Sequence, residues 1–212
     1  AEFSCMRIKQ EKLWSAYNME KTENAVRSRL LEAGMEEFRD RGFLKASLRA
    51  ICKKADVTTG ALYFFFESKS ALFEEIVEET VEKFKEITGD FSNQEKQLQP
   101  EENDRILMEF IWENRDIARI LMDGAEGTRY DNFREDTCTK MEQFLQENFR
   151  EKCGKEADGD LVHILAETKL QGYSELLRGD YSREKFLEIF RMLKICSSQS
   201  FLAVAAEINR NQ

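Results

Sequence analysis

The sequence predicts an all-α protein in which a small N-terminal domain is followed by a larger helical body. Three observations favour this class. The 212 residues include a single proline, Pro100, and few Asn-Gly or Asp-Gly pairs of the kind that close tight hairpins. Along most of the chain, apolar residues recur at spacings of three and four, which is the period of an amphipathic helix. The length suffices for one large domain or two modest ones with an ample core.

The first firm helix is expected from Thr22 to about Asp40. Gly42 ends it, because glycine suits a left-handed C-terminal cap, and Phe43 is expected to fold back onto the core. Residues 1–18 look unlike the rest, and their Ala-Glu-Phe start is typical of a tag. We therefore expect this segment to be a tag or a disordered extension and leave it out of the functional argument.

Two short helices and the start of a third, longer one follow in close succession. Ser47, Thr58 and Ser68 each stand where a side-chain oxygen can accept a backbone N–H at a helix start. The first two helices are too short to be stable alone, so a helix must pack across them. A short helix that follows a sharp turn, with small and hydroxylated residues at its start, fits the major groove of DNA. The spacing therefore makes DNA binding the leading hypothesis.

The remainder of the chain is expected to form a helical body. Residues 70–88 continue the helix that Ser68 caps, and residues 89–99 are polar and expected to be a loop. Pro100, followed by two glutamates, is typical of a first helical turn. The helices of the body are expected to span about 100 to Gly124 or Gly127, 129–150, 159–178 and 183–209. The domain boundaries follow as 19–68 for the DNA-binding part and 69–212 for the body.

Charge is unevenly distributed along the chain. The net charge of −9 by itself argues against nucleic acid. Residues 1–70, however, hold 13 Lys and Arg against 10 Asp and Glu, a net charge of +3, and the remaining residues carry −12. A basic end on an acidic body fits a small DNA-reading domain attached to a larger part with another role.

The cellular setting is expected to be the cytoplasm. No signal or transit peptide is visible, and we expect no apolar run to reach the roughly 18 residues of a membrane span. The five cysteines are scattered without a CxxC motif, which favours reduced, small apolar side chains. A redox-sensing pair among them stays open.

Five segments carry a family resemblance. They are Leu-Leu-Glu-Ala-Gly-Met-Glu-Glu-Phe at 30–38, Gly-Phe at 42–43, Ser-Leu-Arg-Ala-Ile at 47–51, Val-Thr-Thr-Gly-Ala-Leu-Tyr at 57–63 and Phe-Glu-Ser-Lys-Ser-Ala-Leu-Phe at 66–73. In this order and spacing they resemble the N-terminal domain of the TetR family of one-component transcriptional regulators. The resemblance covers residues 25–75, about a quarter of the chain. It implies a three-helix helix-turn-helix domain followed by a ligand-binding and dimerisation domain.

The resemblance also implies which residues meet DNA. The recognition helix opens at Thr58, Thr59 and Gly60, where small side chains let the backbone approach the groove, and Ala61, Tyr63 and Phe64 would face bases or sugars. Helix starts attract phosphate, and Lys69 would add a full charge there. The expected DNA-binding residues are Ser47, Arg49, Thr58, Thr59, Gly60, Ala61, Tyr63, Phe64 and Lys69, with Lys53 and Lys54 as further candidates.

Two positions depart from the family pattern. Phe65 stands where the family often has histidine or tyrosine, so one donor to a phosphate is missing, and Ser70 replaces the usual acidic residue. Lower affinity, or preference for a more apolar and thymine-rich edge, would follow. In the Phe64-Phe65-Phe66 run we expect Phe66 to be buried.

The last two helices, 159–178 and 183–209, have wide apolar faces. These faces fit an intramolecular core, and the resemblance implies a second reading in which the pair forms a four-helix homodimer interface. A groove-reading helix needs such a dimer to reach two half-sites.

The middle helices carry apolar and aromatic residues of the kind that line ligand pockets. The effector-binding candidates are Met108, Phe110, Trp112, Met122, Tyr130, Phe133, Met141, Phe144 and Tyr173, and Arg105, Asn114 and Glu167 are possible polar anchors. For each residue taken alone, a place in the core is the favoured interpretation. The effector could be cationic, held by cation–π contact, or a fatty-acyl, phenolic or neutral drug-like molecule.

The expected function is a ligand-responsive regulator, most simply a repressor that binds a palindromic operator as a dimer and is released by an effector. The alternative is a small-molecule binder or adaptor with weakened DNA binding, as Phe65 allows. An enzyme is not expected: there is no Gly-rich phosphate loop or Ser/His/Asp set, and a di-iron bundle would need two Glu-x-x-His pairs, whereas the chain has only His163. No cofactor, metal site or membrane partner is expected.

Overall fold

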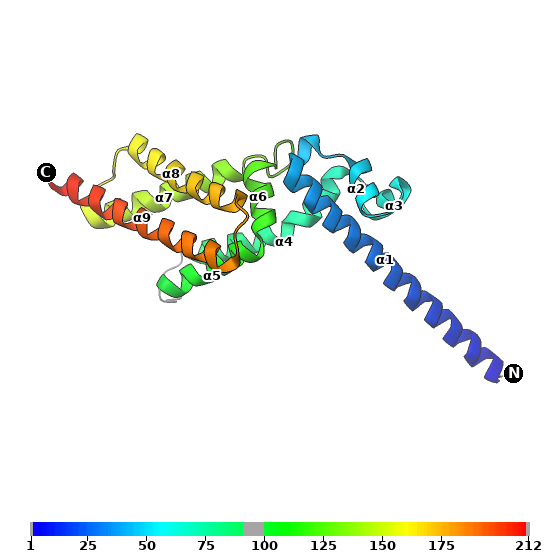
Figure 1. The fold of residues 1–212 in the computed structure, drawn as a ribbon. Coiled ribbons are helices and arrows are strands. Elements are labelled where there is room, and N and C mark those ends of the chain that lie inside the picture. The colour runs from blue at the N-terminus through cyan, green and yellow to red at the C-terminus, as the bar shows by residue number, and fades with distance from the viewer. Residues whose placement is uncertain (1, 91–99, 211–212) are drawn as a thin grey trace.

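The computed structural model describes the backbone of residues 2–90 and 100–210, and the side chains of residues 21–89 and 105–210. Within these ranges the chain forms nine α-helices and no strand, which confirms the all-α class. Their bounds are α1 Glu2–Lys45, α2 Leu48–Lys54, α3 Thr59–Phe65, α4 Lys69–Asp90, α5 Pro100–Glu113, α6 Arg115–Asp123, α7 Phe133–Cys153, α8 Gly159–Arg178 and α9 Arg183–Arg210. Figure 1 shows α2 and α3 at one end, beside α1, and α5 and α7–α9 at the other, with α4 and α6 between them.

The first helix is longer than expected. It begins at Glu2 instead of Thr22 and continues to Lys45, with a kink at Gly42. No glycine or proline interrupts residues 2–33, so nothing in the sequence ends the helix before that point. The interpretation of residues 1–18 as a tag or extension stays a prediction, because the side chains of residues 1–20 lie outside the described part.

The helix caps match the sequence. The Ser47 side chain accepts the Ala50 N–H, Thr58 accepts the Ala61 N–H at 3.1 Å, and Ser68 accepts the Ala71 N–H at 3.0 Å. Asp56, in the turn between α2 and α3, has a φ of 53°, a left-handed conformation that aspartate tolerates better than most residues. The sharp turn that sets the angle of α3 therefore rests on a residue suited to it.

The expected DNA-binding part, residues 19–68, is called the head below, and residues 69–212 the body. The core of the head continues into the body. Phe38 and Phe43 of α1 meet Phe73 of α4, with ring centroids 5.1 and 5.3 Å from that of Phe73. The same buried cluster includes Ile120 and Leu121 of α6. Since α4 and α6 belong to the expected body, the helix-turn-helix and the body are joined by shared core.

Two glycine backbones cross where α1 and α6 end. Gly42 has φ 71° and ψ 164°, a region open almost only to glycine, and a Cβ added there would lie 3.4 Å from the Cα of Gly124. Next to this crossing, the Phe43 N–H donates to the Gly124 carbonyl at 2.8 Å. The end of α1 is thus fixed directly to the end of α6, with no side chain between them.

The helix expected to begin at residue 100 is two helices. It breaks at Asn114, whose side-chain N–H donates to the Phe110 carbonyl at 2.9 Å, while its side-chain oxygen lies 3.2 Å from the Thr80 hydroxyl on α4. The side chain thus competes with the backbone for a helical carbonyl, as asparagine often does. The next expected helix, 129–150, corresponds to α7, which begins and ends a few residues later. Gly154 ends it in the left-handed conformation.

Helices α8 and α9 match their expected ranges, but α9 corrects another expectation. It is long and apolar enough, by length and composition, to cross a membrane: an 18-residue window reaches a mean hydropathy of 1.2, and 11% of that window is buried. The expectation that no run reaches this length is therefore wrong for α9. Lys194 and Glu207 are the only charged residues between Met192 and Asn209, which explains the high hydropathy. A large apolar part of this helix is left without a partner inside the chain.

Candidate nucleic-acid interface and ligand-binding body

The short helix α3 separates an inward from an outward face. Leu62 is fully buried and Phe66, at the C-cap, is 2% exposed, as expected. Tyr63 and Phe64 are 53% and 70% exposed, although both are large aromatic side chains. Because the inner face of α3 packs on the core shared with α1 and α2, its outer face presents aromatic rings and small residues to the outside.

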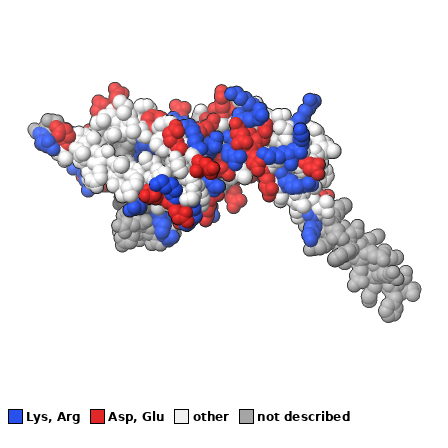
Figure 2. Space-filling model, in the orientation of Figure 1, with Lys and Arg blue, Asp and Glu red and all other residues white. Residues whose placement is uncertain are grey.

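Polar and basic side chains flank α3. Ser47, Arg49 and Lys53 are exposed, and neither Arg49 nor Lys53 makes an ion pair with a described residue. Lys54, by contrast, forms an ion pair with Glu36 of α1. Figure 2 shows lysine and arginine side chains on the head, whereas uncharged atoms dominate the far end of the body on the same face. The free cations available for phosphates are therefore Arg49 and Lys53 among these candidates.

The start of α2 offers fewer free donors than expected. The Ser47 N–H donates to a carboxylate oxygen of Glu37 at 3.1 Å, so this backbone donor is already used inside the protein. The Ser47 hydroxyl accepts the Ala50 N–H and keeps its own proton free to donate. Ser47 can thus reach a phosphate through its hydroxyl.

Lys69 has a different role from the one expected. Its ammonium donates to the carbonyls of Phe43 at 2.6 Å, Leu44 at 3.3 Å and Ala46 at 3.3 Å, and it lies 4.4 Å from the centroid of the Phe43 ring. These three hydrogen bonds use all three of its N–H donors. They satisfy carbonyls at the C-terminal end of α1, where a positive charge also suits the helix dipole. The side chain therefore fastens α4 to α1, and a phosphate contact is not supported.

Comparisons with known proteins identify this head. Residues 30–76 match the family described as bacterial regulatory proteins, tetR family. These residues are similar to the N-terminal DNA-binding domain of TetR-family regulators. The match contains α2, α3 and the first turns of α4, together with the end of α1.

Individual curated proteins show the same likeness over part of their length. The chain is 42% identical over 60 residues to the HTH-type transcriptional regulator UidR of Escherichia coli strain K12, covering 28% of this chain and 31% of UidR. It is 30% identical over 100 residues to the uncharacterized HTH-type transcriptional regulator YdgC of Bacillus subtilis, covering 44% and 51% of the two chains. The matched segments thus span about a third to a half of these curated relatives.

A solved structure extends the likeness to the body. A transcriptional regulator from Aquifex aeolicus VF5, described as of the TerR/AcrR family, shares 26% identity and superposes with a TM-score of 0.53. The superposition covers 81% of this chain and 99% of that one. The arrangement of a helix-turn-helix head on a larger helical body is therefore a TetR-family fold.

The expected effector-binding residues do not share one site. Tyr130 and Phe133 pack on the head-and-junction core, and Met122 and Met141 pack on a second cluster between α7, α8 and α9. Phe144 is 54% exposed. Two surface hollows lie elsewhere, one around Phe38, Gly42 and Asp123 and one along α7 near Gln146, and none of the nine candidates lines either. Their effector-binding role stays a prediction, and their spread over several clusters follows because aromatic residues on amphipathic helices distribute over every core they face.

One subset does come together. Met108 and Trp112 of α5 and Tyr173 of α8 pack against a third cluster with Phe186 and Phe190 of α9, and Phe110 of α5 is also buried. The Tyr173 ring stacks on Phe190 with centroids 4.8 Å apart and an interplanar angle of 15°. Burial raises the pKa of the Tyr173 hydroxyl to about 12. An aromatic-lined region thus exists between α5, α8 and α9.

Two polar residues close to Tyr173 along α8 were missed from the sequence. Lys169 lies one turn before Tyr173 and is half-buried, and burial lowers the pKa of its ammonium. The Ser174 hydroxyl is buried without a hydrogen-bond partner among the described residues. Neither position is unusual in a helical repeat pattern, so only the packing reveals them. Buried polar groups without partners point to a place where a polar ligand group could be satisfied.

Proposed function

We propose that the chain is a cytoplasmic, dimeric, ligand-responsive transcriptional regulator, most simply a repressor that binds a palindromic operator and is released by a small molecule. The observation that carries this proposal is the outward face of α3, where Tyr63 and Phe64 stay exposed at the end of a capped turn. An exposed pair of aromatic rings costs solvation unless it has a partner, and a major groove supplies thymine methyls and sugars for them.

The proposed DNA contacts follow from exposure and chemistry. Thr58, Thr59, Gly60 and Ala61 line the start of α3, where small side chains allow close approach. Tyr63 and Phe64 would contact base edges or sugars, and Ser47, Arg49 and Lys53 would contact phosphates. Lys69 is left out because its ammonium is occupied at the end of α1.

The proposed dimer interface uses α8 and α9. Met192, Ile195 and Leu202 of α9 are 43%, 45% and 48% exposed, and Ile164 of α8 is 60% exposed. On α9 the three residues follow one another at intervals of three and seven, which puts them on a single stripe. A second copy would cover this stripe, and two copies related by a two-fold axis would present two α3 helices to two half-sites.

Ile195→Glu is expected to convert the dimer into a monomer, because it puts a charge into the centre of the proposed apolar stripe. Analytical ultracentrifugation of the full chain measures the change. Gln143→Glu, which adds the same charge at an exposed position of α7, is the control and should leave the dimer intact. A dimer that survives Ile195→Glu and Leu202→Glu at unchanged affinity would place the interface elsewhere.

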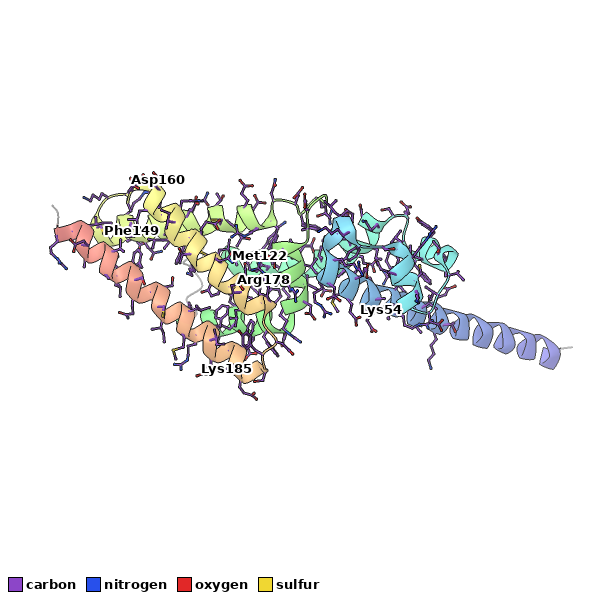
Figure 3. The ribbon with its side chains drawn as sticks, turned by 45° about the horizontal axis from the view of Figure 1, so that its top comes forward. Lys54, Met122, Phe149, Asp160, Arg178 and Lys185 are labelled. Atoms are coloured by element: carbon purple, nitrogen blue, oxygen red, sulfur yellow. The ribbon has the colours of Figure 1, made fainter. Side chains whose placement is uncertain are left out.

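Contacts between body and head supply a route for the effector response. Arg178 at the end of α8 forms a bidentate pair with Asp123 at the end of α6, at 2.7 and 2.6 Å (Figure 3). Gly124 directly follows Asp123, and its backbone contacts the backbone of Gly42 in α1. Displacement of α8 by a bound ligand would therefore reach the base of the DNA-reading head through two consecutive residues.

The proposed effector site lies at the α5–α8–α9 cluster, with Trp112 and Tyr173 as apolar walls. Lys169 and Ser174 argue for an effector that carries an acidic or strongly hydrogen-bonding group, since such a group would pair with the half-buried Lys169 ammonium and with the buried Ser174 hydroxyl, which has no hydrogen-bond partner among the described residues. A purely cationic effector is disfavoured beside Lys169. Met122, Tyr130, Phe133 and Met141 are better accounted for as core, and Phe144 is an exposed side chain of α7.

The deciding experiment measures binding of the purified chain to the DNA upstream of its own coding sequence, compared with a scrambled duplex over a range of salt concentrations. Tyr63→Ala is expected to cost about 1–3 kcal/mol in operator binding and to narrow the gap to scrambled DNA. Tyr181→Ala, which removes an exposed tyrosine of the body, is the matched control and should change neither. Failure of the unmodified chain to prefer any such fragment at low salt would overturn the repressor proposal.

A second candidate function rests on Phe65. Its ring packs half-buried against the core and 5.0 Å from Phe64, so it offers no donor to a phosphate. If the DNA experiment fails while small acidic ligands still quench Trp112 fluorescence, the chain is better described as a ligand-binding or adaptor protein with weakened DNA binding.

A further inference from the structure

Four chemically reactive side chains meet where α7 packs on α8. Cys138 and Glu142 are one turn apart on α7, and His163 and Glu167 are one turn apart on α8. The two helices form an antiparallel hairpin, seen in Figure 1, so each pair faces the other. The Sγ of Cys138 lies 3.7 Å from Oε1 of Glu142, and Nδ1 of His163 lies 2.6 Å from that same oxygen. A thiol, an imidazole and a carboxylate thus converge on one point.

We propose that Cys138, Glu142 and His163 bind a divalent transition-metal ion of the Zn²⁺ type. Their ligand atoms all lie within 4.8 Å of one another. Bond lengths of about 2.3 Å to sulfur and about 2.0–2.2 Å to nitrogen and oxygen put neighbouring ligands of a tetrahedral site roughly 3.3–3.8 Å apart. The Cys138–Glu142 separation already has this value, and the His163–Glu142 contact has to open by about 1 Å when an ion replaces the shared proton.

The chemistry of the three ligands selects the kind of ion. A thiolate with an imidazole and a carboxylate suits Zn²⁺ and its neighbours in the first transition row, whereas Mg²⁺ and Ca²⁺ prefer oxygen ligands alone. Binding exchanges the thiol proton of Cys138 for a metal–sulfur bond and releases that proton to solvent, and the proton that His163 Nδ1 shares with Glu142 also leaves to solvent, or is replaced by one on Nε2 as the neutral imidazole changes tautomer. The thiolate and the Glu142 carboxylate together carry −2, which balances the ion. Three protein ligands leave the fourth tetrahedral position to water.

Burial, together with the Glu167 and Glu142 carboxylates, raises the pKa of the Cys138 thiol to about 12, so the ion itself has to supply the charge that displaces this proton. Arg134 is the nearest cation on α7, and its guanidinium is neutralised by a bidentate pair with Glu167 at 3.0 and 2.7 Å. Cys138 is 4% exposed at the base of the cluster, while the side chain of His163 is 61% exposed at its rim. A metal ion therefore has a path from solvent past His163 to a sheltered sulfur.

Only the structure joins these residues. In the sequence the only histidine has no cysteine within a turn of it, so no metal-binding spacing is visible. The ligands come from two helices, and the hairpin between α7 and α8 creates the cluster. A bound ion would clamp these two helices near the far end of the body, and this site does not depend on the proposed DNA binding.

Metal titration of the full, reduced chain tests the proposal. After treatment with a chelator, the protein is titrated with zinc chloride alone, and in parallel with cobalt chloride as a spectroscopic probe. We expect one ion per chain and a thiolate-to-cobalt charge-transfer absorption. Magnesium and calcium chloride should not compete. Absence of binding, or a cobalt complex without the thiolate absorption, would overturn the proposal.

Matched variants assign the ligands. Cys138→Ser should remove the thiolate absorption, and Cys153→Ser, which removes another free thiol of α7, should leave it unchanged. His163→Gln alters an exposed side chain, so it should weaken zinc binding without loss of helicity by circular dichroism. Glu167→Gln frees Arg134 beside the site and should weaken binding by about tenfold. Zinc binding that persists unchanged in both Cys138→Ser and His163→Gln would show that the ion lies elsewhere and refute the assignment.

Discussion

Phe73→Ala is expected to destabilise the protein by about 3–5 kcal/mol, the usual cost of truncating a fully buried phenylalanine. The Phe73 side chain is fully buried and meets Phe38 and Phe43 of α1, with its ring centroid 6.4 Å from that of Tyr130 in the body. Alanine would leave a cavity between head and body, and the surrounding rings are too rigid to fill it. Urea unfolding followed by far-UV circular dichroism measures the change.

Phe64→Ala is the control for Phe73→Ala. It removes a phenylalanine of the same size that is 70% exposed, so stability should stay within about 0.5 kcal/mol. Operator binding should nevertheless fall, because Phe64 lies on the proposed DNA-reading face. Equal loss of stability in the two variants would mean that the packing of Phe73 against α1 does not stabilise the protein as proposed.

Lys69→Met is expected to lower stability and to leave the salt dependence of DNA binding unchanged. Methionine keeps much of the aliphatic stem but loses the hydrogen bonds to the carbonyls of Phe43, Leu44 and Ala46. Removing a hydrogen-bonded charge typically costs about 1.5–3 kcal/mol, and the partial exposure of Lys69 favours the lower part of that range. Urea unfolding gives the stability, and operator affinity over a range of salt concentrations gives the slope.

Arg49→Met is the companion variant, because Arg49 is exposed and makes no ion pair with a described residue. It should leave stability within about 0.5 kcal/mol and reduce the salt slope by about one unit, the signature of one lost phosphate contact. If Lys69→Met reduced the slope in the same way, the phosphate role inferred from the resemblance would be restored and the structural role described for its ammonium would be incomplete.

Local signals made the head predictable. Ser47, Thr58 and Ser68 act as helix caps whatever lies around them, so the starts of α2, α3 and α4 follow from the sequence. The burial of Phe66 follows in the same way, from its place one turn after Leu62. Predictions of this kind hold because cause and effect lie within four or five residues of each other.

Long-range contacts explain what was missed. The break at Asn114 is supported by Thr80, 34 residues earlier, and the ammonium of Lys69 is taken by carbonyls more than 20 residues away. The cluster at Cys138 and His163 joins two helices. The proposed effector site between α5, α8 and α9 was unpredictable for a different reason. Aromatic residues that line a pocket and those that fill a core show the same helical period.

Hydrogen exchange at one amide beside the Gly42–Gly124 crossing reports on the contact between the head and the body. The Phe43 N–H belongs to the head, yet its acceptor is the Gly124 carbonyl of the body, 2.8 Å away. Such a proton exchanges with deuterium only when this contact opens. Its exchange rate therefore reads out separation of the two parts directly, and ligands or metal ions that loosen or tighten the junction would alter it without any label on the protein.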